Sequence, residues 1–135
     1  MSSYKESIDT NILLRIILGD NMKQREAALK LLKRTGTTFY LSNVAVAEVV
    51  FVLERLIGYE RAGARENLLR VLGAYNNIEY EAEILRKALD VYVEHRSLSF
   101  DDCFLAEEAA FKTYEPLWTF DHKLAVQSGV AKEVR

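Results

Sequence analysis

Short extended stretches alternate with helical ones along the whole chain, and this alternation is the feature that most limits the fold. The expected strands cover residues 4–8, 37–41, 78–80 and 117–120. Helices are expected over residues 11–18, 22–34, 61–72, 81–95 and 99 or 101 to 111, in an apolar segment that Ser42 begins, and after Asp121. Such alternation favours a parallel sheet covered by helices on both faces. The sequence therefore predicts an α/β fold with its functional site at the carboxyl ends of the strands.

Size and composition are those of an ordinary globular chain. The 135 residues, of which 50% are hydrophobic, can bury a proper core, and we expect one domain over residues 1–135. The formal net charge of −2 gives no general attraction to nucleic acid, so polyanion binding requires a local patch. Cys103 is the single cysteine, and we find neither a membrane-spanning run nor a signal peptide. We therefore expect a cytoplasmic protein with no membrane partner.

Glu48 is the only polar side chain in the apolar run of residues 44–53. On a helix, its neighbours three and four positions away are all apolar. A lone carboxylate on such a surface is unfavourable unless a base, hydrogen-bond donors or a metal ion pairs with it. No Lys or Arg is within reach on that helical face, so we expect the partner of Glu48 to come from elsewhere in the fold.

Two aspartates, Asp9 and Asp121, each directly follow an expected strand. If both strands are central and parallel, both carboxylates emerge at the same edge of the sheet. An aspartate after a strand also commonly caps the next helix. Both interpretations, helix cap and functional acid, remain open for each residue at this point.

Asp101 and Asp102 are adjacent, but they are expected on different sides of their helix. On a helical wheel, Glu107 and Glu108 mark the solvent-facing side, and Asp101 projects roughly towards it. Asp102 points almost the opposite way, towards the side of Leu105, so it is expected to face inward. The alternative is a capping box in which Asp102 serves the start of the helix.

Several acids in one pocket would repel each other and could not all stay ionised without a cation. Ligands that offer only oxygen select hard ions such as Mg²⁺ or Mn²⁺ over zinc. Such an ion can orient a water molecule and stabilise charge on a phosphodiester during cleavage. If these acids converge, the sequence therefore predicts a site for such an ion.

Four motifs occur in the order and approximate spacing of PIN domains. They are Asp-Thr-Asn at residues 9–11, the apolar helix with Glu48, Asp-Cys-Phe-Leu-Ala at 102–106 and Thr-Phe-Asp at 119–121. The chain most resembles the VapC-type toxins of prokaryotic toxin–antitoxin pairs, and the resemblance covers nearly its whole length. It implies a three-layer α/β/α sandwich with a parallel central sheet, and metal-dependent cleavage of RNA.

The same resemblance implies roles for individual residues. Thr10, Asn11 and Thr119 fall on positions that often support the acids with hydroxyl or amide contacts. The resemblance also implies an RNA substrate, a cognate antitoxin as partner and a homodimer, for which the helices of residues 44–72 offer apolar surface. The acidic quartet that would hold Mg²⁺ or Mn²⁺ and carry catalysis is Asp9, Glu48, Asp102 and Asp121.

Two features depart from that pattern. The first strand, residues 4–8, is more polar than a central parallel strand should be, so we expect it to be short or exposed near its start. His122 follows Asp121 directly, and we interpret it as an exposed residue at a helix start rather than as a ligand.

Two other functions remain open. One is a PIN-like binding module whose acids hold a basic residue of a partner, and the other is a housekeeping RNA-processing nuclease with the same chemistry. A glycine-rich phosphate loop and a Cys/His zinc motif are both absent from the sequence. Basic residues are spread out, and an RNA track could be built from Arg15, Arg55 or Lys123, although such a scatter is usual for a solvated surface.

Overall fold

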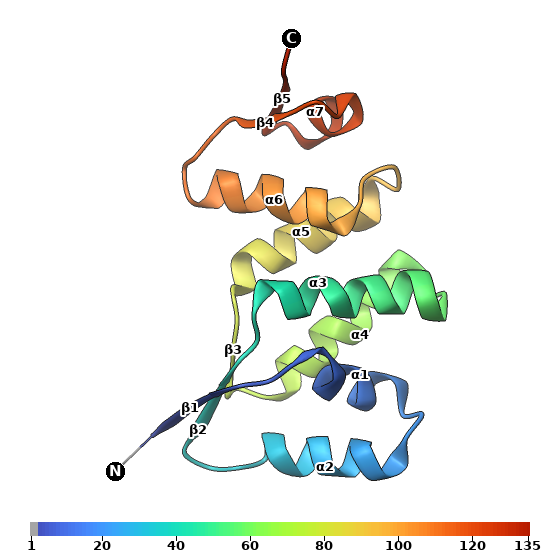
Figure 1. Ribbon diagram of the computed structural model, residues 1–135, viewed down its shortest axis with the longest axis vertical. Helices are drawn as coiled ribbons and strands as arrows, with labels where there is room; N and C mark the ends of the chain where they lie inside the picture. The colour runs from blue at the N-terminus through green and yellow to red at the C-terminus, as the bar shows by residue number, and fades with distance from the viewer. Residues whose placement is uncertain (1–2) are drawn as a thin grey trace. The chain divides into compact units, whose positions relative to one another are not determined.

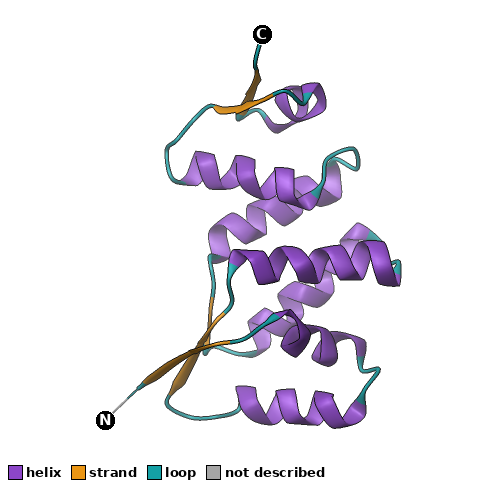
Figure 2. Cartoon of the chain, in the orientation of Figure 1, coloured by secondary structure: helices purple, strands orange, loops and turns teal. Residues whose placement is uncertain are grey.

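A computed structural model describes residues 3–135 of the chain (Figure 1). The chain divides into two compact units, Met1–Tyr80 (unit 1) and Glu81–Arg135 (unit 2). Helices dominate both units, and the strands are short (Figure 2). All strand pairs are parallel and the strands alternate with helices, so the predicted α/β class with parallel pairing is confirmed. The expectation of one domain over residues 1–135 stays a prediction.

Unit 1 contains a three-stranded sheet in the order β1-β2-β3. Tyr4 of β1 aligns with Thr37 of β2, and Phe39 of β2 aligns with Ile78 of β3. Helix α1 packs against α2, α3 and α4. In chain order the elements are β1 (Tyr4–Ser7), α1 (Thr10–Leu18), α2 (Met22–Leu32), β2 (Thr37–Tyr40), α3 (Asn43–Phe51), the π-helical segment η1 (Val52–Ile57), α4 (Arg61–Ala74) and β3 (Ile78–Glu79).

The core of unit 1 joins α1 to the middle strand and the later helices. Leu13, Phe39, Val49, Leu53 and Leu68 are at most 1% exposed. Burying an apolar side chain of this size contributes roughly 1.5–3 kcal/mol, so these residues stabilise the packing of α1, α3 and α4 on one another. The helix starts on which the candidate site depends are thereby fixed within unit 1.

Strand β1 has no buried position. It lies at one end of its sheet and pairs with β2 alone, and a strand in that place tolerates polar side chains. The expectation that a polar first strand would be short and exposed is confirmed. Ile8, the residue after the strand, is buried and anchors the chain just before Asp9.

Local signals set the ends of the helix that carries Glu48. The hydroxyl of Ser42 accepts a hydrogen bond from the backbone N–H of Ala45 at 3.2 Å, so the predicted cap is confirmed. At its other end α3 continues into η1, which closes at Gly58 with a φ of 93°, a left-handed conformation that favours glycine. The π-helical segment was not predicted.

Unit 2 pairs two helices and adds a small two-stranded sheet. Helices α5 and α6 pack together, and the rings of Tyr92 and Phe100 meet edge to face with centroids 5.7 Å apart. Leu117 aligns with Ala131 between the two parallel strands. The elements are α5 (Ala82–Glu94), α6 (Phe100–Phe111), β4 (Leu117–Thr119), α7 (His122–Ser128) and β5 (Ala131–Glu133).

The predicted elements all exist, with different ends. Helix α2 stops at Leu32, two residues early, because Lys33 closes it as the C-cap. Strand β5 was not expected from the sequence, because it is only three residues long and too short to show a period. Among residues 3–135, no helix combines the length and apolar character needed to cross a bilayer.

Candidate active site

Asp9 is placed at the carboxyl end of β1, and it caps α1. Its Oδ1 accepts a hydrogen bond from the backbone N–H of Asn11 at 3.1 Å. The cap interpretation is therefore correct for Asp9, but it uses one oxygen only. Asp9 is exposed, so its other oxygen is accessible to a ligand.

Glu48 finds its partner in Thr10, 38 positions earlier in the chain. The Thr10 hydroxyl donates to Glu48 Oε2 at 3.0 Å, with the carbonyl oxygen of Ala45 at 3.4 Å as its other acceptor. The hydroxyl has a single proton, and the hydrogen bond to the nearer, charged oxygen of Glu48 is the stronger of the two. Thr10 directly follows Asp9, so this bond ties the two acids of unit 1 to one locality.

The environment expected for Glu48 was wrong in one respect. Glu48 is exposed, because the face of α3 that carries it is turned outward. Val44 and Phe51 on the same face are 71% and 56% exposed, whereas Val46 and Val49 are buried. Desolvation therefore does not force a partner on Glu48. Its value as a site residue rests on the contact with Thr10 and on its place beside the end of β1.

Asp102 lies in the first turn of α6 and is half-buried, while Asp101 is exposed. The backbone N–H of Asp102 donates to the Ser99 hydroxyl at 3.1 Å, which is one half of a capping box. In the reciprocal half the acid accepts a hydrogen bond from the backbone N–H of the cap residue, and within residues 3–135 this bond is not formed. The carboxylate of Asp102 is thus left available.

The side of α6 expected to face solvent is only partly correct. Leu105, expected on the inward side, is 49% exposed, while Glu107 and Glu108 are half-buried. Glu108 reaches Lys112 at 3.6 Å, and Lys112 also lies 3.8 Å from Glu81. Because Glu108 and Lys112 pair near the start of α5, the helical wheel was wrong to place Glu108 on a fully solvated face.

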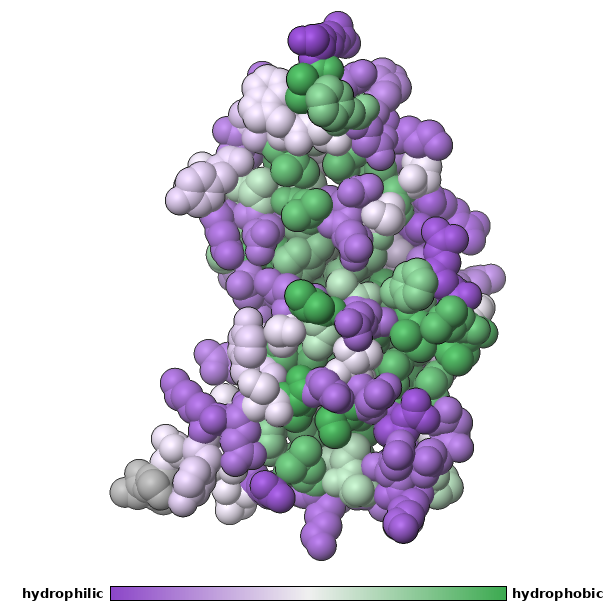
Figure 3. All heavy atoms as spheres, viewed as in Figure 1, coloured by the Kyte–Doolittle hydropathy of each residue, from purple (hydrophilic) through white to green (hydrophobic). Residues whose placement is uncertain are grey.

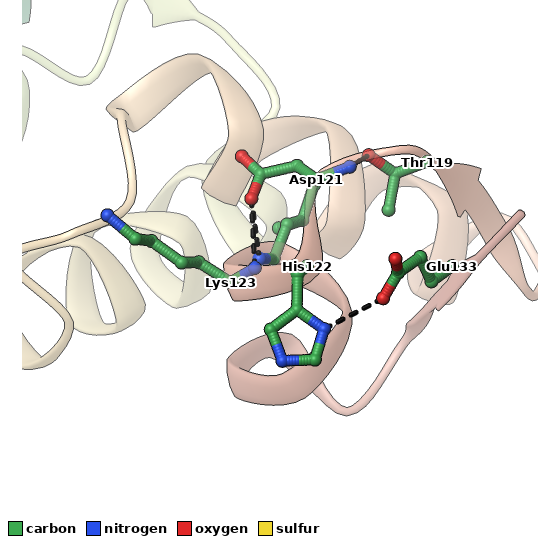
Figure 4. A network of polar contacts seen from close by, with 6 residues as sticks. Thr119, Asp121, His122, Lys123 and Glu133 are labelled. Atoms are coloured by element: carbon green, nitrogen blue, oxygen red, sulfur yellow. Dashed lines mark hydrogen bonds and ion pairs between the residues drawn. The ribbon is translucent and has the colours of Figure 1, made fainter.

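Asp121 caps α7 with one oxygen. Its Oδ1 accepts from the backbone N–H groups of Lys123 at 2.9 Å and Leu124 at 3.3 Å. The Thr119 hydroxyl accepts from the backbone N–H of Asp121 at 2.9 Å, which fixes the turn after β4 (Figure 4). Asp121 is exposed, and its second oxygen is available.

His122 belongs to a different contact. Its Nδ1 lies 2.8 Å from Oε1 of Glu133 on β5, and its ring points away from the Asp121 carboxylate (Figure 4). His122 is 73% exposed, in agreement with its interpretation as an exposed residue at the helix start. A partner on the unpredicted β5 was invisible from the sequence.

The donor set of the four acids suits a hard divalent ion. Within the described part of the chain, each acid keeps at least one carboxylate oxygen that accepts no hydrogen bond. Carboxylate oxygens are the ligands that Mg²⁺ and Mn²⁺ prefer. Unit 1 supplies two of the acids and unit 2 the other two, and neither unit holds a group of three His, Cys, Asp or Glu suited to a metal ion among residues 3–135.

A groove beside Asp9 was not expected from the sequence. This groove lies between α1 and α2, has a volume of about 780 Å³, and includes Lys30, Lys33 and Arg34 in its lining. The spacing of these three residues at the end of α2 was a usable signal. In the sequence, however, these residues belong to a general scatter of basic side chains.

A comparison with curated proteins finds no significant match. Among solved structures, one similar chain comes from the crystal structure of VapBC2 from Rickettsia felis bound to a DNA fragment from its promoter. It has 15% sequence identity and a TM-score of 0.39, and the match covers 96% of this chain and 98% of that one.

A scan against family models gives the assignment. The model of the PIN domain matches residues 7–129, which span every candidate acid from Asp9 to Asp121. PIN domains are typically metal-dependent nucleases, in keeping with an oxygen-only donor set. The chain therefore belongs to the PIN domain family.

Proposed function

We propose that this protein is a Mg²⁺- or Mn²⁺-dependent endoribonuclease that acts as the toxin of a toxin–antitoxin pair. The observation that carries the proposal is the bond between Thr10 and Glu48. It brings an acid of α3 to the residue that follows Asp9, within the region that the PIN model matches. The toxin role rests on the sequence motifs that resemble VapC-type proteins.

In the proposed mechanism the four acids, Asp9, Glu48, Asp102 and Asp121, hold the ion. When bound, the ion supplies Lewis acidity and an activated water for attack on the phosphorus. Thr10 restrains the Glu48 carboxylate by donating to Oε2. Backbone N–H groups at the starts of α1 and α7 restrain Asp9 and Asp121 in the same way, so these three carboxylates are oriented before the substrate arrives.

A binding module is the rival from another class. A module that merely grips a basic partner residue has no need of four acids that each keep a free oxygen. A housekeeping nuclease would use the same chemistry, and finding a small antitoxin-like reading frame directly upstream of the gene would favour the toxin over it.

The decisive experiment compares two adjacent aspartates. Asp102→Asn should abolish Mn²⁺-dependent cleavage of RNA, because it removes a metal-binding oxygen from a half-buried carboxylate. Asp101→Asn, a matched change one residue away on an exposed side chain, should retain most of the activity. Cleavage is followed on a labelled RNA with Mn²⁺ and with chelator. Equal loss or equal retention of cleavage in both variants contradicts the assignment of Asp102, and the absence of Mn²⁺-dependent cleavage by the parent protein contradicts the nuclease proposal.

The proposed antitoxin would act in part by charge. A guanidinium pairs with carboxylates through two parallel hydrogen bonds and keeps its proton, so an Arg from the antitoxin suits a metal-free acidic pocket. Its affinity should fall in Glu48→Gln and should also fall as Mn²⁺ rises. Antitoxin binding that is indifferent to both changes would place the contact on another surface.

The proposed homodimer finds support in exposed apolar side chains. Val44, Phe51, Leu56 and Ile57 are each at least half exposed, and green, apolar surface covers the end of the α3–η1 segment in Figure 3. These residues fall within the segment 44–72 that the sequence favours for self-association. A cluster of this kind is unusual on a surface that stays in water.

A further inference from the structure

The groove between α1 and α2 carries an excess of positive charge. Its polar lining comes from Asp9, Asn11, Arg15, Gln24, Lys30, Lys33 and Arg34. Four of these side chains are cationic, and Asp9 is the one acid. In a chain with a formal net charge of −2, this is the kind of local patch that polyanion binding needs.

Three of the four cations are available to a ligand. Arg15 is held by Asp20 at 2.9 Å. Arg34 only approaches Glu6, at 3.8 Å, and both side chains are about half exposed. Within residues 3–135, Lys30 and Lys33 form no ion pair. Cations near a helix C-terminus also stabilise the helix. That role does not require three cations, and it does not explain why they line one groove together with Asp9.

We propose that this groove holds the phosphodiester backbone of a single-stranded RNA whose chain passes Asp9. The inference rests on the nuclease function proposed above, and adds where its substrate lies. Lys and Arg bind phosphate oxygens, which position a strand without reading its bases. No aromatic side chain is among the described residues that line the groove, so base stacking does not contribute. Binding here depends strongly on salt and weakly on sequence.

An acidic peptide is the other polyanion that could enter. The RNA is favoured because the groove is basic along α2 and meets an acid only at Asp9. That arrangement suits a polyanion that is cleaved at the Asp9 end of the groove with the help of a metal ion. An acidic peptide would meet only repulsion there.

The experiment measures RNA affinity as a function of salt. Full-length protein carrying Asp102→Asn, which blocks cleavage under the proposed function, is titrated against labelled poly-uridine, and binding is followed by fluorescence anisotropy. Lys30→Gln/Lys33→Gln removes two groove cations. Lys23→Gln/Lys87→Gln removes the same charge from exposed positions outside the groove and serves as the matched control.

Each lost phosphate contact reduces the slope of log affinity against log salt by about 0.7 for a single strand. The groove variant should therefore lose about 1.4 in slope, and about 25-fold in affinity near 0.1 M salt, while the control stays close to the parent. Lys33→Gln/Arg34→Gln, beyond the last turn of α2, should reproduce the effect if the first pair disturbs the helix. Thermal melting checks that each variant folds.

Equal slopes and affinities in the groove variants and the control overturn the proposal. Groove variants that lose binding to a polyglutamate peptide, yet bind RNA as before, also overturn it and assign the groove to an acidic partner. The nuclease function is judged separately with Asp102 restored. If the parent cleaves RNA but the lysine substitutions do not change RNA binding, the nuclease proposal holds and the groove proposal is wrong. If the lysine substitutions reduce the salt slope but the parent does not cleave RNA, the groove proposal holds and the nuclease proposal is wrong.

Discussion

Asp121 allows its two roles, helix cap and metal ligand, to be separated by substitution. In Asp121→Asn the side-chain oxygen can still accept from the backbone N–H groups of Lys123 and Leu124, and Asn caps helices about as well as Asp. The loss of charge at the helix start costs only a few tenths of a kcal/mol at an exposed site. In Asp121→Ala the cap itself is lost, at a cost of about 1 kcal/mol.

These costs predict that the two variants differ in stability but not in activity. Asp121→Ala should lower the melting temperature by roughly 3 °C, whereas Asp121→Asn should leave it nearly unchanged. Both should lose Mn²⁺-dependent RNA cleavage, because neither keeps the carboxylate. Circular dichroism gives the melting curves, and a labelled RNA gives the rates.

Two results would refute this reasoning. If Asp121→Asn cleaves RNA as fast as the parent, Asp121 is a cap alone and the quartet loses a member. If Asp121→Asn melts as early as Asp121→Ala, the side chain stabilises unit 2 through its charge and not through the cap geometry. A Mn²⁺ binding isotherm for each variant separates loss of the ion from loss of turnover.

The remaining predictions concern the ion, its support and self-association. Mn²⁺ should raise the melting temperature by mass action, adding about 2.7 kcal/mol at roughly 100 times its Kd, and an unchanged melting curve contradicts the site. Thr10→Val should weaken Mn²⁺ binding or cleavage by roughly 10–100-fold through the freed Glu48, while Thr10→Ser keeps the hydroxyl and should retain function; equal loss in both would exclude the hydroxyl as the cause. Phe51→Asp/Leu56→Asp should convert a dimer into a monomer in sedimentation, and a parent protein that is already monomeric at micromolar concentration removes the proposed interface.

Local signals in the sequence determined where most elements begin and end. Asn21, Ser42 and Ser99 each cap a helix by accepting from a backbone N–H three residues later, and Gly19 closes α1 with a φ of 61°. These contacts involve neighbours only, so they can be read from the residues themselves. For the same reason the carboxylates of Asp9 and Asp121 could be placed directly after their strands.

The tertiary structure decided everything that depends on which faces meet. Helix α3 is apolar on nearly all sides, so its sequence could not show that packing would bury Val49 and leave Glu48 in solvent. The bond from Thr10 to Glu48 joins residues 38 positions apart, and no local pattern encodes such a contact. The groove likewise exists only because α1 and α2 pack together and bring Asp9 beside the cations that end α2. Long-range packing fixes such neighbours, whereas the sequence specifies the chemistry that they bring.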